Sequence, residues 1–123
     1  MSRSRTVAAR LTDILTAIGR IRQAEQQLVA ADAREDVPAT GIAFDAILYN
    51  LVVIGEAVNA LPDDIVDGES QVPWRDVVGM RNFLAHEYFR VLADVVRSTI
   101  DAPLLALEAA CHRLSADIYP RRP

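Results

Sequence analysis

Apolar residues recur along most of this chain at the three- and four-residue spacing of amphipathic helices. One such stripe runs from Thr6 to about Ala31 and predicts a long first helix. A second stripe predicts a helix from about Ile42 to Leu61, which Pro62 ends. The apolar positions of the two stripes are Val7, Leu11, Ile14, Leu15, Ile18, Ile21 and Leu28, and then Phe44, Ile47, Leu48, Leu51, Ile54, Val58 and Leu61.

Two polar segments interrupt this pattern. The segment 33–38 is charged, and Pro38 disfavours helix in the residue before it, so we expect a connection there. The segment 63–72 is polar and contains Gly68, which predicts a surface loop with at most one short helical turn at 64–66.

The C-terminal half continues the helical pattern. Pro73 suits the first turn of a helix, where its missing N–H costs nothing, so a third helix is predicted from Trp74 to His86. After a short connection, a fourth helix is predicted to begin near Leu92 or Ala93.

A proline lies inside the apolar pattern of this last region. Pro103 predicts either a kink or a restart, with Asp101 capping a fifth helix that runs to about Ile118. No strand alternation, repeat or low-complexity tract competes with the helical pattern. The sequence therefore predicts one all-α domain over residues 1–123, an up-and-down bundle of four to five helices.

Composition and charge narrow the functional classes. The 123-residue chain has a net charge of −4, which argues against a general polyanion-binding surface, so any contact with a nucleic acid must be local. The chain has Arg but no Lys. This usage would suit phosphate recognition, but the base composition of the genome is the simpler explanation. Without a long uncharged apolar run or a secretory leader, and with Cys111 as the single cysteine, we expect a soluble cytoplasmic protein.

The segment MRNFLAHEYF, residues 80–89, carries the candidate chemistry as Arg-x-x-x-x-His-x-Tyr: Arg81, His86 and Tyr88. Arg offers a charged planar fork for phosphate oxygens, and His has an unperturbed pKa near neutrality, a pair suited to phosphodiester chemistry without a metal. In a straight helix these two residues are separated by about 140° around the axis. Either the helix ends near Ala85 and His86 turns back, or two chains assemble the site.

Three blocks around this motif resemble the HepT-like branch of the HEPN superfamily: IGEAVNALP (54–62), VPWRDVVGMRN (72–82) and AHEYF (85–89). The resemblance implies an all-helical, homodimeric ribonuclease toxin in which the motifs of two subunits face a shared cleft. It also implies a cognate antitoxin, a minimal nucleotidyltransferase of the MntA type, in a type VII-like toxin–antitoxin pair.

The same resemblance implies roles for individual residues. His86 would be the general acid/base, Arg81 would stabilise charge on the phosphorane-like transition state, and Asn82 would orient the phosphate or His86. Tyr88 would accept AMP from the nucleotidyltransferase. Glu56 either braces Arg81 or His86, or only marks the solvent edge of the second helix.

The predicted activity is metal-independent RNA cleavage that needs no cofactor and leaves a 2′,3′-cyclic phosphate. Two alternatives stay open: a non-catalytic HEPN subunit that binds nucleotide or substrate for a nucleotidyltransferase, and a purely structural helical dimer. The motif could also be only a helix-end salt-bridge cluster that includes Glu87. His112 beside Cys111 lacks further ligands at metal-binding spacing, so we expect no metal there.

Overall fold

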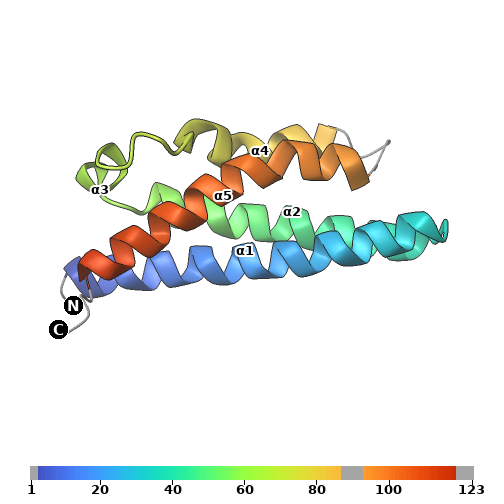
Figure 1. Cartoon of the computed structure of the whole chain (residues 1–123), viewed down its shortest axis with the longest axis horizontal. Helices are drawn as coiled ribbons and strands as arrows, with labels where there is room; N and C mark the ends of the chain where they lie inside the picture. Colours follow the sequence, from blue (N-terminus) through green and yellow to red (C-terminus); the bar gives the residue numbers. More distant parts are fainter. Residues whose placement is uncertain (1–2, 87–92, 119–123) are drawn as a thin grey trace.

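The computed structural model describes residues 3–86 and 93–118, which form five helices and, within these ranges, no strand (Figure 1). The helices are α1 (Arg3–Ala33), α2 (Val37–Asn59), α3 (Asp63–Asp67), α4 (Trp74–His86) and α5 (Ala93–Ile118). The predicted all-α class is confirmed, and α3 covers the short turn expected at 64–66.

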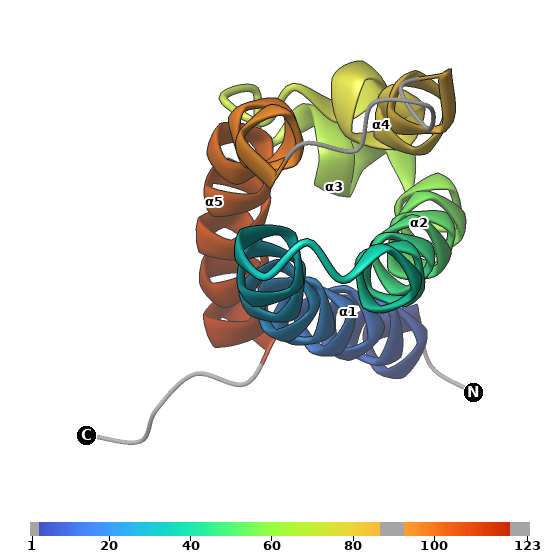
Figure 2. The same ribbon diagram turned by 90° about the vertical axis from the view of Figure 1, so that its right-hand side faces the viewer.

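The four long helices alternate in direction along the chain and surround one core (Figure 2). α1 packs on α2 and α5, and α4 packs on the same two helices from the other side. Every residue of the two predicted stripes is buried except Leu15 and Leu48, which are partly buried against the core. The hydrophobic pattern thus fixes which face of each helix is turned inward.

The N-terminus of α2 differs from the prediction. α2 begins at Val37, because the Asp36 side chain accepts a hydrogen bond from the backbone N–H of Ala39 at 3.1 Å and caps the helix. Pro38 lies in the first turn, where no backbone donor is required. The residues expected to form most of a connection therefore include both a helix cap and a helix start.

The predicted restart at Pro103 is wrong, because α5 is one helix from Ala93 to Ile118 with Pro103 inside it. Asp101 therefore lies within α5 and does not cap a fifth long helix. Pro103 has no N–H to donate to the carbonyl of Thr99, four residues earlier, so the helix continues at the cost of that hydrogen bond.

The connection before α4 is held in place by Glu69, which is buried. Its carboxylate accepts a hydrogen bond from Nε of Arg113 in α5 at 2.8 Å. Its carbonyl accepts one from the Trp74 indole at 3.0 Å. These two bonds fix the start of α4 relative to α5, and Trp74 packs against the core.

Helix α2 is long and apolar enough to span a bilayer by length and composition alone. Its inward face nevertheless contributes Phe44, Ile47, Leu51 and Ile54 to the core. Core helices of soluble proteins pass the same length and composition test.

Candidate active site

The candidate catalytic residues all lie on α4. The side of α4 that packs on the core determines which of its residues face solvent. Val77 and Leu84 are fully buried. With these positions turned inward, Arg81, Asn82 and His86 are exposed. The helix therefore presents Arg81, Asn82 and His86 to solvent.

Arg81 is available to bind an anion. Its guanidinium contacts Oδ1 of the adjacent Asn82 at 3.5 Å, the outer limit of a hydrogen bond. Within residues 6–86 and 93–118, no carboxylate pairs with it. Asn82, predicted to orient a phosphate or His86, thus lies beside the Arg81 guanidinium.

His86 is exposed and is still helical, as the last residue described in α4. It makes no hydrogen bond to Arg81 in the described part of the chain. The two residues are separated by about 140° around the helix axis. The arrangement in which the helix ends early and His86 turns back is thus not observed. A single chain does not bring the two residues together.

Glu56 is exposed on α2 and forms no ion pair or hydrogen bond with Arg81 or His86 among the residues described. In the single chain, Glu56 therefore lies at the solvent edge of the second helix, as one alternative predicts, and does not brace Arg81 or His86. Tyr88 and Glu87 lie outside the described residues, so the predictions for them have no structural counterpart.

The Cys111 and His112 pair does not form a site. Cys111 is buried, and burial raises the pKa of its thiol to about 12, whereas His112 is exposed. No group of three or more His, Cys, Asp or Glu residues within the described ranges could hold a metal ion.

A groove that the sequence pattern does not predict runs between α4 and α5. Its volume is about 470 Å³, and its lining residues are Arg75, Asp76, Gly79, Met80, Phe83, Thr99 and Pro103. Phe83, between the motif Arg and His, is 55% exposed. An aromatic residue at an outward position of the motif was the sequence signal that could have revealed it.

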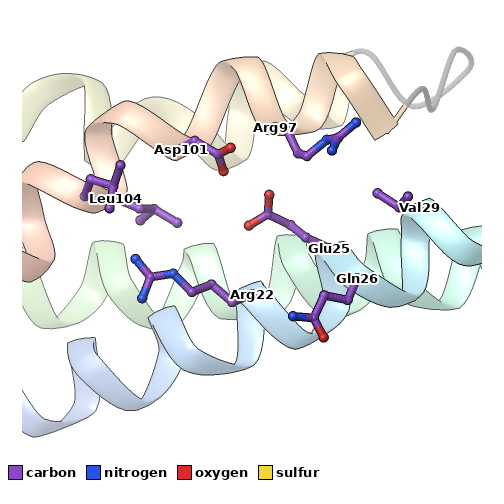
Figure 3. Close-up of a pocket in the computed structure, with 8 residues that line it drawn as sticks. Arg22, Glu25, Gln26, Val29, Arg97, Asp101 and Leu104 are labelled. Carbon is purple, nitrogen blue, oxygen red and sulfur yellow. The ribbon is translucent and has the colours of Figure 1, made fainter.

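A second cavity, of about 550 Å³, lies on the α1–α5 side of the bundle (Figure 3). There the carboxyl group of Glu25, a residue only 8% exposed, points toward α5, where Asp101 faces it. Burial, followed by the hydrogen bond and negative charge of Asp101, raises the pKa of Glu25 to about 7. No α4 residue lines this cavity, so it is separate from Arg81 and His86.

The Arg-x-x-x-x-His-x-Tyr motif lies within a segment, residues 14–114, that matches the family described as "Ribonuclease HepT-like". The chain belongs to this HepT-like family. The match includes α2 and α4 entirely and most of α1 and α5. The resemblance predicted from the three sequence blocks is confirmed.

Curated relatives carry ribonuclease names. A "Putative RNase" of Caldanaerobacter subterraneus is 38% identical over 74 residues, which is 60% of this chain and 66% of the relative. A "Probable ribonuclease HepT" of Thermococcus cleftensis is 32% identical over 69 residues, which is 56% of this chain and 63% of the relative. The chain thus spans somewhat less than two thirds of these relatives, and no solved structure matches it.

Proposed function

We propose that this HepT-like protein is a metal-independent endoribonuclease whose site is assembled by two copies of the chain around Arg81 and His86. The supporting observation is the exposure of both side chains on α4, with Arg81 unpaired by any described carboxylate. An unpaired guanidinium on a protein of net charge −4 provides local attraction for a phosphate group.

In the proposed reaction, the 2′-oxygen of a ribose attacks the adjacent phosphorus while a base removes its proton. The bond from phosphorus to the 5′-oxygen breaks, and an acid protonates that oxygen. The products are a 2′,3′-cyclic phosphate and a 5′-hydroxyl. Imidazole can serve as base in its neutral form and as acid in its protonated form, so two His86 residues could supply both functions.

Arg81 would stabilise the negative charge that builds on the phosphoryl oxygens in the transition state. Pairing two chains would also resolve the geometry, because the Arg81 of one chain could then work beside the His86 of the other. The separation of these residues on one helix supports the homodimer in this proposal.

We further propose that the protein is a cytoplasmic toxin that a nucleotidyltransferase of the MntA type neutralises by transferring AMP to Tyr88. A nucleotide attached two residues after His86 would place a negative phosphate near Arg81. Like-charge repulsion and steric occlusion would then exclude RNA.

The test is cleavage of a single-stranded RNA beside the same sequence with 2′-fluoro sugars. We expect the RNA to yield fragments ending in 2′,3′-cyclic phosphate, identified by mass, and the 2′-fluoro strand to stay intact because it lacks the nucleophile. Fragments that carry a 5′-phosphate, or equal cleavage of both strands, would contradict the proposed chemistry.

A further inference from the structure

The α4–α5 groove lies beside the motif on one side of α4. Gly79, Phe83 and His86 are spaced four and three residues apart, so they follow one another along the same side of the helix. Gly79 and Phe83 both line the groove, and the next residue of this row is His86. The groove therefore leads toward the proposed acid/base.

The floor of the groove is open because Gly79 has no side chain. Apart from its chain neighbours and its own helix backbone, a Cβ built on Gly79 meets no atom within 4 Å. A larger side chain at this position would therefore extend into the groove.

The walls of the groove combine an aromatic face with hydrogen-bond acceptors. Phe83 is 55% exposed, and nucleobases stack on such rings. The two oxygens of the Asp76 carboxylate are acceptors, and Thr99 and Pro103 line the groove from α5. Arg75, also exposed, supplies a positive charge for a backbone phosphate.

We propose that this groove is the nucleobase subsite of the RNA substrate. It binds the base next to the scissile phosphate, stacked on Phe83, and favours guanine over uracil. The Watson–Crick edge of guanine offers N–H donors from the ring and from the exocyclic amino group to a carboxylate, whereas uracil offers a single ring N–H between two acceptors. This inference rests on the proposed function, because it names how the same site selects its substrate.

The experiment measures binding, so that it can be separated from cleavage. Fluorescent 2′-fluoro oligonucleotides with either guanine or uracil at one position, in an otherwise identical strand, are titrated with the protein and followed by anisotropy. The variants are Gly79→Leu, which fills the groove, Phe83→Ala, which removes the stacking face, and Asp76→Asn, which alters the acceptor. Gly19→Leu is the matched control, since Gly19 also has no atom within 4 Å of an added Cβ and lies on α1, away from the groove.

The subsite predicts that Gly79→Leu and Phe83→Ala weaken binding of the guanine strand by about 5- to 150-fold, the range of one base–aromatic stack. Phe83→Trp should keep the affinity. Asp76→Asn should remove the preference for guanine with a smaller loss of overall affinity, and Gly19→Leu should bind as the unaltered protein does.

Three results overturn the subsite: no binding of either strand, full binding by Gly79→Leu, or a preference that survives in Asp76→Asn. A change from dimer to monomer in Phe83→Ala with RNA affinity retained would also overturn it, because the groove would then be a protein interface. If the unaltered protein binds with the expected preference but never cleaves RNA, the ribonuclease proposal fails while the subsite stands.

Discussion

The arginines on the α1–α5 face and those on the outer face of α4 differ in whether they form ion pairs with carboxylates. Across the α1–α5 face, Arg22 forms two hydrogen bonds to Glu108, at 2.7 and 2.8 Å, and joins the two helices. The hydrogen bond from Arg22 lowers the pKa of Glu108. On α4, Arg75 and Arg81 form no ion pair with any described residue.

This difference separates a structural arginine from one that is available to a ligand. Exposed ion pairs contribute at most about 1 kcal/mol, so the fold loses little when Arg81 has no partner. A permanently charged group left without a carboxylate can then bind an external phosphate. The contrast predicts that the same substitution on the two faces affects different properties.

The largest effect is expected from Arg81→Ala. Removing a group that stabilises transition-state charge should lower the cleavage rate by about 100- to 1000-fold, with little change in the thermal unfolding midpoint. Single-turnover cleavage of RNA measures the first quantity, and circular dichroism on heating measures the second. Arg22→Ala is the control and should cleave normally; equal losses in the two variants would remove the distinction between the faces.

The next effect concerns stability and compares two neighbours on α4. Leu84→Ala should lower the free energy of unfolding by about 2–5 kcal/mol, because Leu84 is fully buried and a cavity would remain. Phe83→Ala should change it by less than about 1 kcal/mol, since its ring is half exposed. Urea unfolding measures both, and similar losses would show that Phe83 belongs to the core and not to an accessible groove.

A pH-dependent effect is expected from Glu25 on the α1–α5 face. Its pKa is raised from 4.5 to about 7 in the fold, so the folded state holds this proton more tightly than the unfolded chain does. The stability that this bound proton contributes is therefore fully present below about pH 4.5 and is lost as the pH rises through 7. Asp101 faces Glu25 with like charge, while Arg22 and Arg97 partly offset it.

Glu25→Gln should thus raise the free energy of unfolding at pH 8 by about 1–2 kcal/mol, a range reduced for solvent screening, and should have little effect at pH 4. Urea unfolding at the two pH values measures this difference. Glu56→Gln, at an exposed position of α2, is the control and should show no such pH dependence. A Glu25→Gln variant that is less stable at pH 8 would contradict the assignment.

The smallest effect is expected from Arg22→Ala, which should lower the free energy of unfolding by less than about 1 kcal/mol. The loss should shrink in concentrated salt, which screens exposed charges. Urea unfolding at low and high salt measures it. A loss of several kcal/mol would mean that the α1–α5 ion pair holds the bundle together.

Local sequence pattern was sufficient to predict most of the fold. The two apolar stripes identified the buried faces of α1 and α2, and Pro73 marked the start of α4. The pattern misplaces the start of α2, because it predicts a connection at Asp36 and Pro38. In the structure, Asp36 caps the helix and Pro38 lies in its first turn. It also overstated Pro103, which stays inside α5.

Only the part of the candidate site that lies on a single helix, α4, was predictable from the sequence. The spacing of Arg81 and His86 identified the motif and its angular separation. The groove was not predictable, because Thr99 and Pro103 approach Gly79 and Phe83 only once α5 packs on α4. The pairing of Glu25 with Asp101 likewise depends on the contact between α1 and α5, two helices far apart in the sequence.

The most direct test is cleavage of total cellular RNA in EDTA by the purified protein, beside Arg81→Ala and His86→Ala variants that fold and associate as the unaltered protein does. We predict that the unaltered protein cuts and that both variants do not. Inertness of all three, with Tyr88 shown by intact mass to be unmodified, would contradict the ribonuclease account and favour a non-catalytic binding subunit.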